Sequence, residues 1–177
     1  MPSQLSLRPF DVAVALRLTL VPEDRYEPMA FTMATSTSAV HRAVARLQHA
    51  GICLQGKRTV QVPALMEFLV HGVRYAFPAV FGPERAGLPT AGTHPALLPI
   101  LPASEPPRAF VWPMEGGASR GESLVPLFNG QCKVAQRDAT LHKLLAAVDL
   151  LRVGSPSHRT VAAQWMAAEL TGAAPVE

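Results

Sequence analysis

The chain of 177 residues has few cysteines, little charge and no long apolar runs. Two cysteines, Cys53 and Cys132, cannot build a disulfide framework, so we expect a reducing, cytoplasmic setting. No apolar run reaches the roughly 18 residues that a membrane-spanning helix needs. The first residues also lack the pattern of a secretory signal, and we expect no membrane contact. Charged residues make up only 16% but hydrophobic residues 49%, which excludes wholesale disorder.

Recognisable catalytic and metal-binding motifs are missing as well. The sequence contains no P-loop, no GxGxxG and no GxSxG. Its six histidines and two cysteines show no HxxxH, CxxC or CxH spacing. We therefore expect no enzyme, no cofactor and no metal site. His142 is expected in solvent on a polar helix face, Cys53 is expected to pack as a small apolar group, and the glycines of 116–121 are expected in a plain loop.

Acidic residues are absent from one long stretch. None occurs between Glu27 and Glu67, whereas four basic residues and two histidines do. The whole net charge of +3 lies in residues 1–62, because residues 63–177 carry equal numbers of acids and bases. A stretch that omits one sign of charge is a candidate contact for a polyanion, although a solvated face is the simpler explanation.

Three helices are predicted within residues 8–51. Residues 8–20 alternate in hydropathy like a strand, but Pro9 at the start and the alanines inside favour a helix. A second helix follows Pro28. After a turn, Ser36 is placed to cap a third helix, whose buried stripe is Val40, Val44 and Leu47. Gly51 is expected to end that helix in the left-handed conformation.

A hairpin is predicted next. The runs 52–54 and 59–62 flank Gln55-Gly56-Lys57-Arg58, a turn that contains glycine. Pro63 then opens a short helix that we expect to stop at Gly72.

Residues 78–126 hold ten of the seventeen prolines and six glycines. Long helices are therefore excluded, and we expect an extended wrap with only short strands such as 109–112.

The remainder is predicted to be helical. Asp138 can cap a helix with an apolar stripe, and Ser157 can cap a last helix to Leu170. We expect the stripe of 138–152, together with residues 8–20, to form a dimer surface.

The spacing Met29-Ala30-x-x-Met33-Ala34-Thr35-Ser36, followed by Val40, Val44, Leu47 and Ala50-Gly51-Ile52, resembles a winged helix-turn-helix. This is the DNA-binding module of many small bacterial regulators, including MarR-like ones. The chain departs from the pattern at Ala34, where glycine is usual. The resemblance covers about a fifth of the chain by motif.

The resemblance implies that the third helix enters the major groove and that the hairpin is a wing beside it. Arg42 is the expected base-edge contact, because a guanidinium can bond guanine with two hydrogen bonds. Ser38 and His41 are secondary candidates. The remaining expected DNA-binding residues, mainly phosphate contacts and outward helix positions, are Ser36, Thr37, Ala45, Arg46, Lys57 and Arg58.

The sequence thus predicts a mainly α fold with a small β-hairpin wing. Residues 1–77 would be the DNA-binding domain, and 78–177 a Pro-rich wrap with a helical region for dimerisation or a partner. The expected function is a transcriptional regulator, a homodimeric repressor on an inverted-repeat operator in double-stranded DNA. One alternative is an antitoxin-like protein that neutralises a toxin-like partner and represses its own operon. Another is an interaction adaptor without DNA contact.

Overall fold

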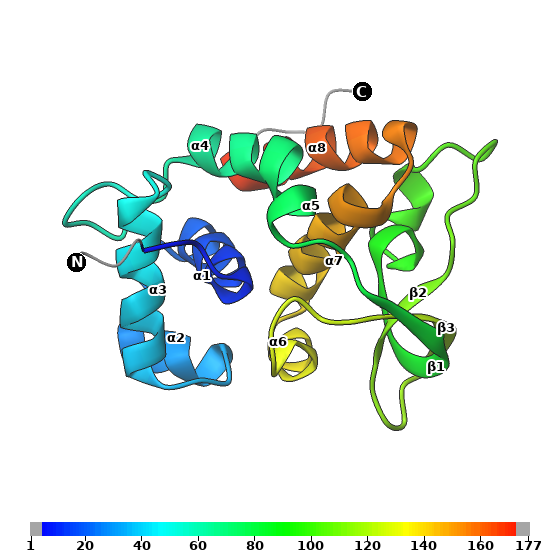
Figure 1. Ribbon diagram of the computed structural model, residues 1–177, viewed down its shortest axis with the longest axis horizontal. Helices are drawn as coiled ribbons and strands as arrows, with labels where there is room; N and C mark the ends of the chain where they lie inside the picture. The colour runs from blue at the N-terminus through cyan, green and yellow to red at the C-terminus, as the bar shows by residue number, and fades with distance from the viewer. Residues whose placement is uncertain (1–4, 173–177) are drawn as a thin grey trace. The chain divides into compact units, whose positions relative to one another are not determined.

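The computed structural model describes residues 5–172 (Figure 1). It combines helices with a small three-stranded sheet in a mixed α/β fold. The chain divides into two compact units. Unit 1 comprises residues 1–65 and 127–141, and unit 2 comprises residues 66–126 and 142–177. The sequence predicts a boundary at residue 77. In the structure the boundary lies after residue 65, and residues 127–141 belong with the N-terminal part of the chain.

Unit 1 begins with α1 (Pro9–Leu20), which confirms the predicted helix over residues 8–20. Pro9 occupies the first turn, and the backbone N–H of Arg8 donates to the Asp11 carboxylate at 2.8 Å. The middle of α1, from Val12 to Leu16, is buried on all sides. A helix that is apolar all round lies in a core, and this explains why its sequence shows no helical stripe.

Two helices and a tight turn follow α1: α2 (Tyr26–Thr32) and α3 (Thr37–His49). Ala34 in the turn has a φ of 50°, the left-handed conformation that glycine adopts at lower cost. Ser36 caps α3 as predicted, since its Oγ accepts from the Ala39 N–H at 3.3 Å. The expected stripe of Val40, Val44 and Leu47 is buried.

The predicted hairpin is present but shorter than expected. Leu54 N–H donates to the Thr59 carbonyl at 3.0 Å, and Gln61 N–H donates to the Ile52 carbonyl at 2.8 Å. Its ladder holds a single bridge pair, Cys53 with Val60. The second run ends early because the residue before Pro63 already belongs to α4 (Val62–Glu67).

Residues 127–141 complete unit 1 with α6 (Gln131–Arg137), a helix that the sequence analysis did not predict. The ring of Phe128 meets that of Phe10 edge to face, with centroids 5.3 Å apart. Asp138 accepts from the Arg17 guanidinium at 2.8 Å. These two contacts hold the segment against α1.

Unit 2 continues the helical path beyond the expected stop. A π-helical turn (Phe68–Gly72) leads into α5 (Val73–Ala76), so Gly72 does not end the helix. Its backbone is helical, and a Cβ at this position would lie 2.9 Å from the Phe68 ring. Gly72 is therefore explained by the close approach of that ring.

The Pro-rich segment is not a simple wrap. It forms β1 (Phe81–Thr90), β2 (Phe110–Pro113) and β3 (Ser119–Leu124). β1 is antiparallel to both of the others, β2 and β3 are parallel, and the three close into a barrel. Pro83 is tolerated in β1 because it lies where the strand is irregular, between Gly82 and Glu84.

Close backbone packing explains the glycines of this barrel. A Cβ on Gly87 would lie 2.1 Å from the Trp112 carbonyl oxygen, and one on Gly117 would lie 2.4 Å from the Cα of Gly87. The glycines around 116–121 thus serve strand packing as well as the turn.

Two long helices follow, α7 (Ala139–Val153) and α8 (Pro156–Thr171). Asp138 caps α7 as predicted, accepting from the Leu141 N–H at 2.9 Å. The cap of α8 is Ser155 rather than Ser157, because Pro156 takes the first helical position. The apolar stripe of α7 is buried within the chain, like the apolar residues of α1. The expectation that these two helices form a dimer surface is therefore wrong.

Candidate nucleic-acid interface

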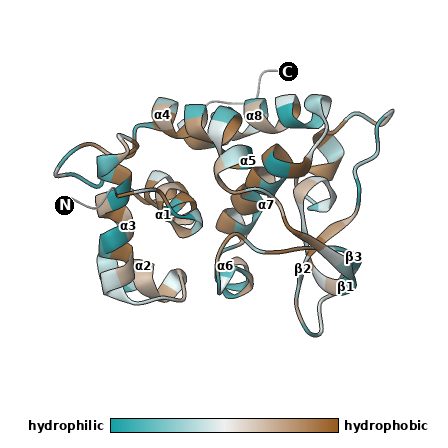
Figure 2. Ribbon diagram, in the orientation of Figure 1, coloured by the Kyte–Doolittle hydropathy of each residue, from teal (hydrophilic) through white to brown (hydrophobic). Residues whose placement is uncertain are grey.

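The outward face of α3 carries polar and basic side chains. Figure 2 shows the alternation of hydrophilic and hydrophobic residues along this helix. Of the expected DNA-binding residues, Thr37 is half-buried and five others on this helix or its cap are exposed: Ser36, Ser38, His41, Arg42 and Ala45. Within residues 5–172, the Arg42 guanidinium forms no ion pair. It is therefore available to a ligand.

Arg46 does not belong to this face, and its expected exposure is wrong. Its Nη2 and Nε donate to the two carboxylate oxygens of Asp11 at 2.6 and 2.7 Å. The two side chains are 9% and 1% exposed. The hydrogen bond from Arg46 to Asp11 is the main cause that raises the pKa of the arginine. The pair joins α3 to α1 and has the geometry of a structural link.

Arg58 is also engaged within the chain. Its guanidinium donates to the Asp24 carbonyl and lies 4.9 Å from the centre of the Tyr26 ring. The His41 ring stacks on the same tyrosine at a centroid distance of 3.6 Å. Tyr26 thereby connects the hairpin, the start of α2 and the outer face of α3. Sequence analysis missed it, since a single tyrosine beside a turn gives no periodic signal.

The hairpin tip is held to the end of α3 by two amide side chains. Gln48 donates to the Lys57 carbonyl at 2.7 Å, and Gln55 donates to the Gln48 carbonyl at 2.6 Å. Lys57 itself is exposed. The two bonds fix the backbone that carries this cation while leaving its side chain in solvent.

Several acids of unit 1 are paired internally. Asp11 binds Arg46, while Asp24 and Asp138 bind Arg17 at 2.7 and 2.8 Å. Glu23 and Glu27, before and within α2, remain exposed. Asp11, Asp24 and Asp138 are thus engaged by Arg46 and Arg17, and none of them pairs with Arg42 or Lys57.

Unit 2 contains a buried polar network around Asp149. Its carboxylate accepts from Thr90 at 2.9 Å, from the Trp112 indole at 2.6 Å and from Arg152 at 2.6 Å. Burial raises the pKa of Asp149, and the charge of Arg152 and these hydrogen bonds oppose the rise. The network links β1 and β2 to α7. Because Thr90, Trp112 and Arg152 all donate to the buried carboxylate, we assign the network a structural role.

A pair of histidines lies beside this network. The rings of His94 and His142 meet edge to face, with centroids 4.5 Å apart. Burial, with the charges of His142 and Lys143, lowers the pKa of His94 to about 4. His142 is half-buried and hydrogen-bonds the Pro89 carbonyl at 3.0 Å, so the expectation that it is solvent-exposed is wrong. Burial lowers its pKa too.

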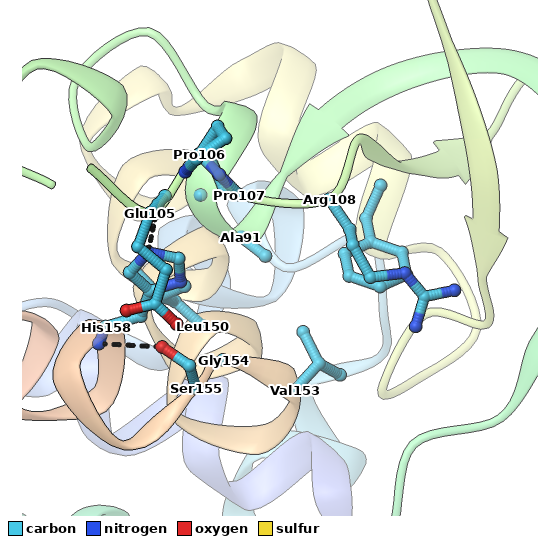
Figure 3. A pocket seen from close by; sticks show the side chains of 12 residues that line it. Ala91, Glu105, Pro106, Pro107, Arg108, Leu150, Val153, Gly154, Ser155 and His158 are labelled. Atoms are coloured by element: carbon cyan, nitrogen blue, oxygen red, sulfur yellow. Dashed lines mark hydrogen bonds between the residues drawn. The ribbon is translucent and has the colours of Figure 1, made fainter. Parts of the chain in front are cut away.

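A small pocket of about 200 Å³ opens in unit 2 (Figure 3). Its polar side holds Glu105, Ser155 and His158, while Leu150 and Val153 belong to its apolar wall. The Glu105 carboxylate accepts from the hydroxyl of Ser157, which is the main cause lowering its pKa. The chain thus places a carboxylate of its own at the start of α8, where a negative charge is favourable.

In the part of the chain that the structure describes, no three His, Cys, Asp or Glu side chains gather as a metal site requires. Burial raises the pKa of the Cys53 thiol to about 11, and the side chain packs in the core as expected. Within residues 5–172, no helix combines the length and hydropathy that crossing a membrane requires.

Comparison with known proteins gives no relative. No family model, no curated protein and no solved structure matches the chain.

Proposed function

We propose that unit 1 is a winged helix-turn-helix module and that the protein is a DNA-binding transcriptional regulator. α2 and α3 are the helix pair, α3 is the recognition helix, and the hairpin after it is the wing. The order of three helices and a hairpin supports this proposal, as does the close packing of α1 and α2 on α3.

The observation that carries the proposal is the state of Arg42. This guanidinium is exposed on the outer face of a capped helix, and it forms no ion pair within residues 5–172. A helix of this kind fits the major groove, and arginine can bond guanine with two hydrogen bonds. Ser38 lies one turn before Arg42, and Lys57 on the hairpin is suited to a phosphate.

The structure changes the roles that we assign to the other basic residues. Arg46 positions α3 on α1 through Asp11, and Arg58 positions the hairpin on Tyr26. Neither is proposed as a DNA contact. A single recognition helix reads only a few base pairs, so two copies on an inverted repeat are the arrangement that we propose. Such a regulator is most simply a repressor.

The proposal is tested by selecting bound fragments from genomic DNA at stated salt, and then comparing Arg42→Ala with the parent on the selected site. In each half-site we expect the variant to lose about 1–3 kcal/mol of binding free energy and its preference at one base pair. Arg85→Ala is the matched control, because Arg85 is an exposed arginine of β1 in unit 2. Its affinity should equal that of the parent.

The proposal fails if no fragment is enriched, or if Arg42→Ala and Arg85→Ala bind the selected site equally well. The first result would favour the adaptor alternative, in which the module contacts protein only. Circular dichroism of both variants establishes that they are folded.

A further inference from the structure

One tyrosine of unit 1 packs against the sequence neighbours of both cations of the proposed DNA-binding face. Tyr26 is the first residue of α2 and is half-buried. The ring of His41, the residue before Arg42, stacks on it at a centroid distance of 3.6 Å. The guanidinium of Arg58, the residue after Lys57, lies 4.9 Å from its centroid. The tyrosine therefore belongs to the same face as the two cations.

The hydroxyl of Tyr26 serves no contact of the fold. Within residues 5–172 it forms no hydrogen bond, and the buried side-chain atoms that lack one there all belong to Gln131. The hydroxyl is therefore open to solvent. A tyrosine hydroxyl is a neutral donor, and phosphate oxygens of DNA are among the acceptors that such a group binds.

The ring that carries this hydroxyl is already ordered. The stacked imidazole covers it, and the Arg58 guanidinium beside it is itself held, because it donates to the Asp24 carbonyl. A side chain that is fixed before binding loses little conformational entropy when it takes a ligand. The hydroxyl is thus a preorganised donor.

We propose that Tyr26 binds a phosphate of the DNA backbone through its hydroxyl. This inference rests on the proposed function and adds a contact to the same face. The Arg42 guanidinium is assigned to a base edge and Lys57 to a phosphate. A ring that packs against the neighbours of both, and that belongs to α2 rather than to the helix in the groove, lies at the edge of the groove, where the backbone runs.

A neutral donor has a different effect on binding from either cation. Tyr26→Phe removes a phosphate contact but no charge, so the release of counterions is unchanged and the variant should keep the parent salt slope. Phosphate contacts carry no sequence information directly, so the loss should be the same factor on every sequence. Arg42→Ala, in contrast, changes sequence preference, and Lys57→Ala changes the slope.

Fluorescence anisotropy with the selected site and with an unrelated duplex measures this effect. One hydrogen bond between neutral partners is lost, so we expect Tyr26→Phe to weaken binding about threefold to tenfold for each bound copy. Tyr75→Phe is the matched control. Tyr75 is the other tyrosine of the chain, is 71% exposed in unit 2, and also has an arginine over its ring, Arg74 at 4.7 Å. Its variant should bind like the parent.

Urea unfolding separates this contact from a structural role. The phenyl ring of Tyr26→Phe retains the stack with His41 and Arg58, and the missing hydroxyl had no partner within residues 5–172. The free energy of unfolding should therefore equal that of the parent. A variant that loses stability together with affinity would show that the hydroxyl serves the fold, and would overturn the inference.

Fluorine NMR tests the contact without removing the hydroxyl. The full chain grown with 3-fluorotyrosine should give two signals, because it contains two tyrosines, and Tyr75→Phe assigns them. Added duplex should shift the Tyr26 signal and leave the Tyr75 signal in place. An unshifted Tyr26 signal in the complex, or equal affinities of Tyr26→Phe and the parent, overturns the inference and leaves the proposed function standing. A chain that binds no duplex at all overturns both.

Discussion

The buried pair between Asp11 and Arg46 provides the sharpest test of how unit 1 is built. Arg46→Met keeps the length of the side chain but leaves the Asp11 carboxylate buried without its charged partner. Asp11→Asn keeps an acceptor for the Arg8 N–H but leaves the Arg46 charge buried. Both partners are at least nine-tenths covered and joined by two hydrogen bonds. We therefore expect each single variant to lose about 3–5 kcal/mol of unfolding free energy.

The double variant should recover most of that loss, because no unpaired charge remains in the core. Replacing a buried ion pair as a whole is often neutral. Urea unfolding followed by circular dichroism measures the four proteins of this cycle, and the coupling energy should be at least about 2 kcal/mol. A loss below about 1 kcal/mol for Arg46→Met would refute the reasoning.

The same double variant separates the structural role of Arg46 from the DNA contact that sequence alone predicts. If Arg46 holds α3 on α1, the double variant binds DNA with the parent dependence on salt. Loss of a phosphate contact would instead reduce the slope of log affinity against log salt by about 0.9 for each bound copy, or about 1.8 for the two copies.

Three further predictions address other parts of the chain. Ala34→Gly should stabilise the protein by about 1 kcal/mol in urea unfolding, because Ala34 has a φ of 50°, where a Cβ is unfavourable; a destabilised variant would contradict this. Because the pKa of His94 is lower in the folded chain than in the unfolded chain, only the unfolded chain binds a proton there between the two pKa values. Unfolding free energy should therefore fall as pH drops from about 6.5 to about 4, and more steeply in the parent than in His94→Asn; parallel curves would contradict this. Gln48→Ala should lower DNA affinity by about 1 kcal/mol in the parent but not in Lys57→Ala, since the bond from Gln48 serves only to hold Lys57; equal losses in both backgrounds would exclude that role.

Local signals predicted α1 and α3 of unit 1 well, whereas α6 of the same unit was not predicted. Pro9, the Ser36 cap and the spacing of Val40 and Val44 each act within one or two turns of helix, so they can be read from the sequence. α1 is a helix that hydrophobic periodicity does not indicate. Its residues are buried on all sides, and only Pro9 and the alanines indicated a helix.

Pairings between distant residues could not be predicted in the same way. Arg46 occupies an outward position by helical spacing, yet Asp11, 35 residues earlier, draws it into the core. The barrel was missed because prolines usually disfavour strands. Its closure depends on the close approach of Gly87 to Trp112 and of Gly117 to Gly87, which is a tertiary property.

The candidate site was predicted in part. The sequence indicated the exposed positions of Arg42 and Lys57 correctly. It gave no sign that His41 and Arg58 both lie against Tyr26, because that stack brings together three separate elements.

The salt dependence of DNA binding is the sharpest test of whether α3 and its hairpin contact DNA. We expect log affinity to fall linearly with log salt, and Lys57→Ala to reduce the slope by about 1.8 on every sequence tested, about 0.9 for each of the two bound copies. Lys133→Ala, which removes an exposed cation of α6 from the same unit, should keep the parent slope. Equal slopes for the parent and Lys57→Ala, or binding without salt dependence, would contradict the assignment of α3 and its hairpin as the DNA-binding face.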